Sequence, residues 1–373
     1  MTLTTVQDNL LRQAEEVASS LERGAPPGSG RVDRELIRSL AESGLLARLY
    51  PEQGVSAMDL CLIRQGLARI DTEAETAFAM QGLGSYPIHQ SARPEVAQHW
   101  IPGVARGEIV PAFALTEPGA GSDAAALALA AERDGEGWRL SGEKAWISNA
   151  PDADVYVVFA RTTPDAGSRG VTAFLVPADS PGLSGIAVEM MSPHPIGNLV
   201  FDGVPVPPEH LLGDVDGGFT VAMGTLDLFR PSVGAFAVGM AEAALRIAQR
   251  HAEDREAFGR PIFDFQAVSH SLADLATKTA AARLLVYEAA SAYDRGDQQT
   301  VTGLAAMAKL TATETAQEVV DGAVQILGAR GLEAGHPLAH LYRDVRAPRI
   351  YEGTSEIQRG IIARELRQGR LTW

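Results

Sequence analysis

Hydrophobic residues follow a helical period at both ends of this chain and a period of two in between, and this pattern limits the possible folds most. Three early helical stretches are separated by short Pro and Gly breaks: Val6–Leu21, Asp33–Leu46 and Asp59–Ile70. From Val110 the period is two, and after Gly217 and Gly218 it is helical again to the end. We therefore expect helices, then strands, then helices.

The middle segment predicts a β domain that ends near Gly213. Runs such as Ala153–Phe159 and Val171–Val176 are rich in β-branched and aromatic residues. The sequences DGEG, TPDAGS and SPGLSG, which favour turns, punctuate these runs.

The last segment predicts a helical bundle, because its apolar residues step by three and four along two long stretches. Pro231 lies in the first stretch, where it should kink the helix. The two stripes are Leu226, Phe229, Val233, Phe236, Met240, Ala244 and Ile247, and Val268, Leu272, Leu275, Thr279, Ala282, Val286, Ala289 and Tyr293.

The boundaries of these segments predict three domains in a mainly α fold with a central β domain. We place a helical domain at residues 1–110, a β domain at 111–216 and a helical domain at 217–373. The length of 373 residues suits two or three domains, and 46% hydrophobic with 21% charged residues suits a soluble chain with a sizeable core.

The charge balance disfavours nucleic acid as a partner. The chain has 32 basic and 47 acidic residues, a net charge of −15, whereas phosphate backbones are bound by clustered Lys and Arg. An anionic ligand would have to be held by a few local Arg residues and backbone amides within an acidic surface.

Cys61 is the only cysteine, which excludes an internal disulfide and a zinc cluster made of cysteines, so we expect a reduced, buried thiol. The first seventeen residues include three acidic side chains and read as an amphipathic helix rather than a secretory or transit peptide. The longest apolar runs fall short of the roughly 20 residues that a membrane span needs. We expect a cytoplasmic protein.

One carboxylate near the C-terminus is the leading candidate for chemistry. Glu352 lies in RIYEGTSEIQR beside Gly353, which lets backbone or ligand approach closely. Ser355 and Gln358 have the spacing of a capping box that opens the last helix. A carboxylate at such a place can be a general base, an anion partner or a helix cap, and the motif alone leaves all three open.

Four further motifs accompany this one in the same chain. They are ALTEPGAGSD (114–123), EKAWISN (143–149), REAFGRPIFDFQ (255–266) and QILGARG (325–331). With the C-terminal turn they stand in the order and approximate spacing of the acyl-CoA dehydrogenase family, which the chain resembles over nearly its whole length. The resemblance implies a β-barrel or β-sandwich as the middle domain, a four-helix bundle as the C-terminal domain, and a homotetramer.

The resemblance also implies the chemistry. It predicts FAD where the β domain meets the bundle, α,β-dehydrogenation of a thioester, and electron transfer to an electron-transfer flavoprotein. Glu352 would remove the α proton while its backbone N–H and a flavin hydroxyl donate to the thioester oxygen. We expect desolvation to raise the pKa of Glu352. Some branches of the family carry the base just before an arginine on the first bundle helix, but that position is Phe229, which cannot be a base.

The same resemblance assigns binding residues one by one. On the substrate side they are Ser122, Asp227, Arg230, Tyr351 and Gly353, with an ordinary interhelical ion pair as the alternative for Arg230. The FAD contacts, for which core packing is the alternative at Trp146, are Phe113, Leu115, Thr116, Ser122, Trp146, Ser148, Arg255, Phe258, Phe265, Gln266, Thr354 and Glu356, with Gln325, Gly328 and Ala329 reaching the FAD of another subunit.

Three departures from the family pattern bear on these assignments: the first leaves the carrier of the acyl group open, and the other two weaken individual FAD contacts. The segment MMSPHPIGNLVF replaces a stretch rich in Lys or Arg, Gly and Ser near the thioester arm, so the carrier can be coenzyme A or an acyl-carrier protein. Ala329 and Ala257 replace a glycine and a residue that often bears a hydroxyl. Phe229 favours a short, branched or cyclic acyl group.

Other sequence motifs give little support for a metal site or for another class of enzyme. His336 and His340 have helical metal-ligand spacing, but Pro337 lies between them, so we expect structural histidines and no metal. His194 could face a ligand or solvent. No GxSxG elbow, Walker loop or Rossmann fingerprint is present. A flavoprotein without catalysis, or an assembly scaffold, is the remaining alternative.

Overall fold

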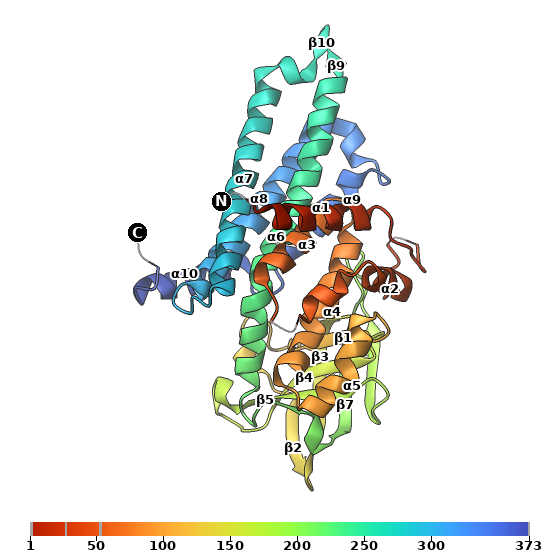
Figure 1. The fold of residues 1–373 in the computed structure, drawn as a ribbon, viewed down its shortest axis with the longest axis vertical. Coiled ribbons are helices and arrows are strands. Elements are labelled where there is room, and N and C mark those ends of the chain that lie inside the picture. The colour runs from red at the N-terminus through yellow and green to blue at the C-terminus, as the bar shows by residue number, and fades with distance from the viewer. Residues whose placement is uncertain (1–2, 27, 52–53, 372–373) are drawn as a thin grey trace. The chain divides into compact units, whose positions relative to one another are not determined.

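The computed structural model describes residues 3–26, 28–51 and 54–371. These divide into two compact units, each built from segments that are far apart in the sequence. We call them the α unit (Met1–Ser20, Val55–Glu75 and Asp227–Trp373) and the β unit (Leu21–Gly54 and Thr76–Leu226). Along the chain, helices precede strands and helices follow them, so the predicted order of elements is confirmed (Figure 1).

The α unit is dominated by three long helices, α6, α7 and α8 (Figure 1). Its elements, of which α6 begins in the β unit, are α1 (Thr5–Ala18), α3 (Ala57–Ala68), α6 (Gly218–Asp254), β9 (Glu256–Ala257), β10 (Arg260–Pro261), α7 (Gln266–Asp294), α8 (Val301–Leu327), α9 (Pro337–Asp344) and α10 (Ser355–Arg367).

The predicted apolar stripes form the interior of this unit. Phe229, Val233 and Met240 of α6 are buried, and so are Ala282 and Val286 of α7. The helix α6 continues through Pro231, so this proline does not end it.

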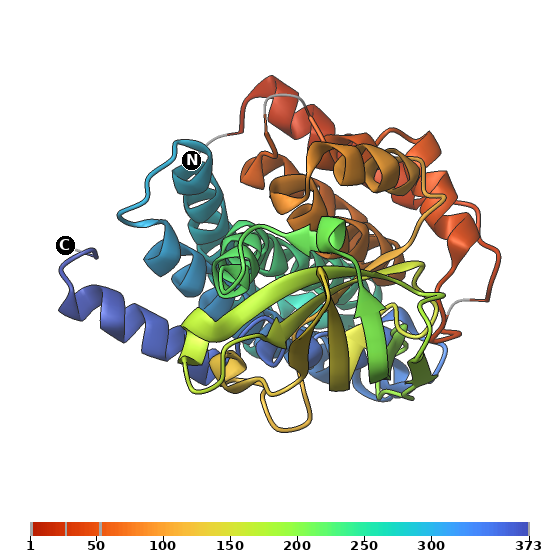
Figure 2. The same ribbon diagram turned by 90° about the horizontal axis from the view of Figure 1, so that it is seen from below.

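The β unit holds one eight-stranded sheet (Figure 2). Its elements, of which α4 begins in the α unit, are α2 (Arg34–Glu42), α4 (Thr72–Ser91), α5 (Pro94–Ala105), β1 (Pro111–Ala114), β2 (Ala130–Asp134), β3 (Gly137–Ser148), β4 (Val155–Arg161), β5 (Val171–Pro177), β6 (Leu183–Ala187), β7 (Ile196–Val206) and β8 (Leu211–Leu212).

The sheet follows the order β6-β7-β3-β2-β4-β5-β8, with β1 paired to β4 in parallel. Strands β4 and β5 are antiparallel and buried along most of their length, as their β-branched and aromatic residues predict. Ile88 of α4 and Val96 of α5 pack into the apolar core beside Val157 and Leu175, so these helices cover one face of the sheet.

The second predicted helix is shorter than expected. The sequence predicted a helix over Asp33–Leu46, but α2 ends at Glu42 and a 3-10 turn follows at Leu46–Leu49. Gly44 lies between them with φ +81°, a left-handed conformation that ends helices.

Cys61 is buried and unpaired in α3, and its burial raises the pKa of the thiol. None of the described helices combines the length and the apolar content that a bilayer crossing requires.

Candidate active site

The turn that carries Glu352 lies between a 3-10 turn at Ala347–Arg349 and helix α10. Thr354 is the N-cap of α10, and its hydroxyl accepts a hydrogen bond from the backbone N–H of Ile357 at 3.3 Å. The predicted capping box of Ser355 and Gln358 is therefore wrong: the cap lies one residue earlier, and Ile357 at the third helical position has no polar side chain to complete a box. Ser355 is the first helical residue, and its hydroxyl donates to Glu314 at 2.7 Å.

Glu352 adopts a conformation that few side chains accept. Its φ is +52°, and Gly353 follows with φ +92°. A non-glycine residue in the left-handed region costs energy and persists only where its surroundings hold it, often at functional sites. The strain falls on the candidate base itself.

Side chains from three helices hold the carbonyl groups of this turn. Lys309 of α8 donates through Nζ to the carbonyl oxygens of Tyr351 at 2.9 Å and Gly353 at 2.6 Å. Gln358 of α10 donates to those of Glu352 at 3.2 Å and Gly353 at 3.0 Å. Arg230 of α6 adds a longer bond of 3.4 Å to the Glu352 carbonyl. The turn is thus fixed from several sides.

The carboxylate of Glu352 lies near three positive charges, and one of its oxygens has no hydrogen-bond partner among the described residues. Its Oε2 atom is buried and forms no hydrogen bond within the described residues. Burial raises the pKa of Glu352, while the charges of Arg64, Lys309 and Arg230 oppose that rise. The expected direction of the shift is confirmed, and burial outweighs the three cations.

Arg64 of α3 supplies one of these charges from the interior of the α unit. Its guanidinium forms an ion pair with Glu75 and donates to the Ser232 hydroxyl at 2.7 Å. Arg64 and Glu75 are only 2% and 1% exposed, so the pair is shielded from water.

Arg230 forms an ion pair with Asp227 at 2.8 Å, one turn earlier on α6. This contact lies within one helix, so the interhelical ion pair considered for Arg230 is wrong. Burial raises the pKa of Asp227 although Arg230 opposes the rise. Tyr351 and Gly353 flank Glu352, and Glu356 is exposed on the first turn of α10, so these residues gather at one place in the α unit.

In the β unit, the predicted residues cluster where β1 and β3 end. Phe113 packs on Phe159 with ring centroids 4.8 Å apart, and the carbonyl of Leu115 accepts from the buried Lys144 at 2.9 Å. The carbonyl of Thr116 accepts from the backbone of Ala145 at 3.0 Å. Ser122 lies on an exposed loop nearby in the chain.

Trp146 lies at an irregularity in the pairing of β3 with β7, between Lys144 and Ile147. Its φ is +54°, and its side chain is 50% exposed, so the core-packing alternative for Trp146 is wrong. A bulge re-aims a side chain out of the regular alternation of a strand. Two residues later, the hydroxyl of Ser148 and Nε2 of His194 are 2.8 Å apart, so His194 faces a predicted site residue.

A third group surrounds the β9–β10 hairpin of the α unit. Phe258 is 96% exposed at φ +53°, and its ring meets the edge of Phe265 at 6.0 Å. Arg255 and Gln266, at either end of the hairpin region, are exposed. Farther along the chain, Gln325, Gly328 and Ala329 are exposed at the end of α8.

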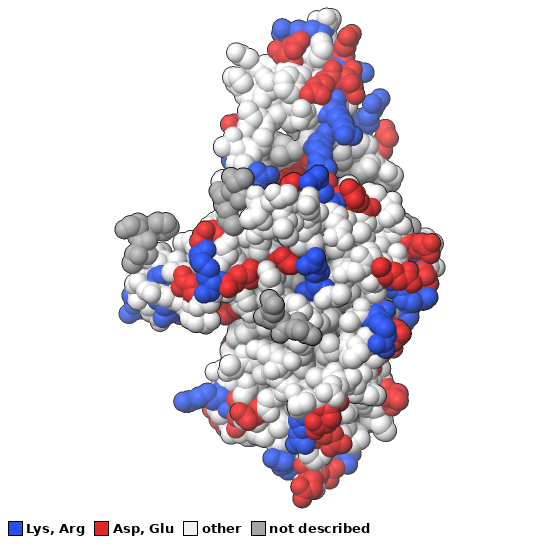
Figure 3. Space-filling view, in the orientation of Figure 1, with Lys and Arg blue, Asp and Glu red and all other residues white. Residues whose placement is uncertain are grey.

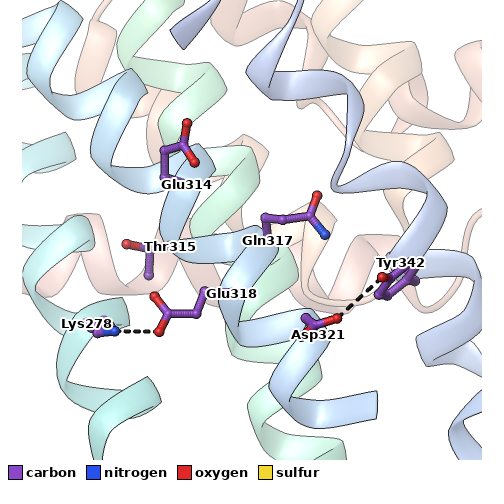
Figure 4. Close-up of a pocket in the computed structure, with 7 residues that line it drawn as sticks. All are labelled: Lys278, Glu314, Thr315, Gln317, Glu318, Asp321 and Tyr342. Carbon is purple, nitrogen blue, oxygen red and sulfur yellow. Dashed lines mark hydrogen bonds and ion pairs between the residues drawn. The ribbon is translucent and has the colours of Figure 1, made fainter. Parts of the chain in front are cut away.

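An open pocket with a volume of about 710 Å³ lies beside α7, α8 and α9 (Figure 4). It contains an ion pair between Lys278 and Glu318 and a 3.3 Å bond from Tyr342 to Asp321. None of the predicted site residues lines this pocket.

The two histidines with metal-ligand spacing serve other contacts. His336 caps α9 by accepting from Leu338 at 3.1 Å, and Nε2 of His340 lies 2.9 Å from both Thr72 and Asp344. Arg64, Lys309 and Gln358 were not singled out from the sequence as site residues. A lysine inside the apolar stretch AAMAKL could have indicated that Lys309 is buried for a specific purpose. The sequence alone does not show its partners, because the turn around Glu352 lies more than forty residues away in the chain.

Comparison with known proteins supports the fold described above. Models of the N-terminal, middle and C-terminal domains of acyl-CoA dehydrogenases match residues 4–108, 112–204 and 216–367. The chain belongs to the acyl-CoA dehydrogenase family. Members of this family are FAD-dependent oxidoreductases, and this chain shares their fold of three domains.

Three relatives illustrate the match. The chain is 39% identical to the mitochondrial short-chain specific acyl-CoA dehydrogenase of Bos taurus, over 91% of this chain and 85% of that protein. It is 33% identical to the cyclohexane-1-carbonyl-CoA dehydrogenase of Geobacter metallireducens, over 95% of both. The structure of butyryl-CoA dehydrogenase from Megasphaera elsdenii gives a TM-score of 0.91 at 33% identity, over 98% of this chain and 99% of that one.

The residues assigned to FAD fit such a group. The exposed indole of Trp146 offers a flat apolar face, and the half-buried side chains of Thr116 and Ser148 offer hydroxyl groups to a ring edge. Exposed Arg255 provides a cation suited to a phosphate.

Proposed function

We propose that this chain converts an acyl-CoA thioester to the 2-enoyl-CoA, with Glu352 as the base that removes the α proton. The buried Oε2 of Glu352, without a hydrogen-bond partner among the described residues, carries this proposal. A carboxylate without a partner is costly to bury, but a base that removes a proton from carbon needs a free oxygen in a dry place.

The reaction removes a proton from the α carbon and a hydride from the β carbon, and a double bond forms between them. FAD, when bound, supplies the hydride acceptor that no side chain provides. Glu352 takes the proton, and its backbone N–H donates to the thioester oxygen as negative charge develops there. Arg230, which is paired with Asp227 and donates to the carbonyl of Glu352, would help to orient the substrate beside the base.

We infer a short, branched or cyclic acyl group as the substrate. Phe229, directly before Arg230 on α6, is buried in the interior of the α unit and is 1% exposed. The relatives named for short-chain, butyryl and cyclohexane-1-carbonyl thioesters support the same range.

Membership of the family also supports a proposal about the electron acceptor, the oligomeric state, the compartment and the pathway. We propose that the electrons pass to an electron-transfer flavoprotein, and that the chain forms a cytoplasmic homotetramer in the pathway of fatty acid metabolism. Gln325, Gly328 and Ala329 are exposed, as residues that reach the FAD of a neighbouring subunit must be.

Anaerobic titration of the purified, yellow protein with butyryl-CoA tests the proposal. We expect the flavin absorbance near 450 nm, roughly where oxidised flavins absorb, to bleach because FAD accepts the hydride. Glu352→Gln keeps the size of the side chain but cannot accept the proton, so we expect bleaching about 10²- to 10⁴-fold slower. Glu132→Gln, the same change at an exposed carboxylate of β2 outside the predicted site, is the matched control and should bleach at the normal rate.

A fully active Glu352→Gln variant would remove Glu352 as the base. A protein that binds no FAD and shows no bleaching with any thioester, yet still assembles, would favour a scaffold.

One observation supports a second candidate, a dehydrogenase of acyl-carrier-protein or specialised-metabolite thioesters. The segment 188–195 between β6 and β7 contains no Lys or Arg, and it exposes Met190 and Met191. Apolar residues suit a protein carrier better than the phosphates of coenzyme A. Bleaching by carrier-protein thioesters, while every coenzyme A thioester fails, would establish this candidate.

A further inference from the structure

Lys309 is a buried cation that the proposed reaction does not use. It lies in the middle of α8 with a side chain that is 0% exposed. Burying an ammonium group is costly unless hydrogen bonds and opposite charges compensate for lost water. Its location therefore needs a reason beyond the packing of α8.

The partners of Lys309 supply that reason. The two carbonyl groups that accept from its Nζ atom belong to Tyr351 and Gly353, the residues on either side of Glu352. The two bonds therefore span the one residue of the turn that is held at φ +52°. Because such a conformation persists only where the surroundings hold it, the bonds oppose relaxation of the turn.

We propose that Lys309 is a positioning residue that holds Glu352 in the conformation from which its carboxylate takes the α proton. This inference rests on the proposed role of Glu352 as the base. Gln358 shares the carbonyl of Gly353, but among the residues that the structure describes Lys309 alone joins the two flanking carbonyls.

The positive charge of Lys309 has a second effect on Glu352, because it acts on the pKa of the carboxylate. The ammonium of Lys309 favours the ionised form of Glu352, as Arg64 and Arg230 also do. The pKa of Lys309 is lowered to about 8, mainly by burial and in part by Arg230, although Glu352, Glu314 and Glu356 oppose the decrease. Removing the lysine should therefore raise the pKa of the base as well as loosen the turn.

Two measurements separate a positioning role from a purely structural one. The first is the dependence of kcat on pH with butyryl-CoA. The second is exchange of the α protons of acetyl-CoA with D₂O, measured by mass spectrometry. Acetyl-CoA has no β carbon from which a hydride could leave, so its exchange reports the base alone. Both use the FAD-loaded protein.

For Lys309→Met we expect exchange and kcat to fall by about 100-fold, the effect of a small misplacement of a reacting group, while KM stays within about threefold. The acidic limb of the kcat profile should move to higher pH. Lys309→Arg retains the charge and the donors and should restore part of the exchange. Lys278→Met, which removes a half-exposed lysine of α7 paired with Glu318, should change neither measurement.

Lys309→Met with normal exchange and an unmoved pH profile would overturn the proposal. If that variant does not fold, Lys309→Gln decides, because it retains a donor without the charge, and an unmoved acidic limb would again overturn it. If Glu352→Gln itself exchanges normally, the proposed base is wrong. Loss of exchange in Glu352→Gln with normal exchange in the Lys309 variants would refute only the positioning role.

Discussion

At the scale of single residues, the ion pair between Arg64 and Glu75 shows how charge is kept near the candidate base without solvent. Both side chains are almost completely buried, and the hydroxyl of Ser232 accepts a further hydrogen bond from Arg64. Removing one partner leaves the other as an uncompensated buried charge. We expect Arg64→Met to lower the free energy of unfolding by about 3–5 kcal/mol, measured by urea denaturation.

Replacing both charges should recover most of that loss. The double variant Arg64→Met, Glu75→Leu buries two apolar side chains of similar size, which often costs little compared with an ion pair. Arg106→Met removes the exposed pair of Arg106 with Glu108 and should leave the unfolding curve in place. A single Arg64→Met variant as stable as the parent would show that the buried pair does not contribute as its burial implies.

At the scale of elements, the start of α2 depends on one carboxylate. Asp33 is the N-cap, and its oxygens accept from the backbone of Glu35 and Leu36 at 3.1 Å and from Gly24 and Ala25 at 3.0 and 3.1 Å. These bonds lower the pKa of Asp33 although burial opposes the shift. We expect Asp33→Ala to lower the free energy of unfolding by about 1–2 kcal/mol near neutral pH.

The dependence of this loss on pH follows from the lowered pKa. The folded protein holds the carboxylate ionised to a lower pH than the unfolded chain does, so its stabilisation is present above about pH 4 and fades as the pH falls further. Urea midpoints of the parent and Asp33→Ala should therefore converge in acid. Asp33→Asn, which keeps an uncharged cap, should lie between them, and a constant gap at every pH would contradict the assignment.

Local patterns predicted the elements better than their ends or their contacts. The change of period identified the order of helices, strands and helices, because an amphipathic face depends on residues close together in the sequence, but it did not predict α4 and α5 individually. The stop of α2 before Gly44 was missed although a glycine marked it. The motif around Glu352 revealed the candidate base, whereas Lys309 and His194 could not be placed, since their partners come from other elements.

At the scale of the whole molecule, charge should slow the arrival of substrate. The net charge is −15, and residues of both signs are scattered over the visible face (Figure 3). Coenzyme A thioesters are anions, so the net field repels them before local cations can act. Raising the salt from about 0.01 to 0.15 M shortens the screening length from about 30 to 8 Å, so kcat/KM for butyryl-CoA should increase.

A butyryl thioester of N-acetylcysteamine provides the control for this salt effect, because it presents the same acyl group without phosphates. Its kcat/KM should not change over the same range of salt, while that of butyryl-CoA increases severalfold and then levels off. A decrease for butyryl-CoA would mean that a local basic surface dominates its approach. In that case basic residues elsewhere in the chain would bind the phosphates of coenzyme A, although segment 188–195 contains no Lys or Arg. The composition of this segment would then no longer favour a carrier protein as the natural thioester donor.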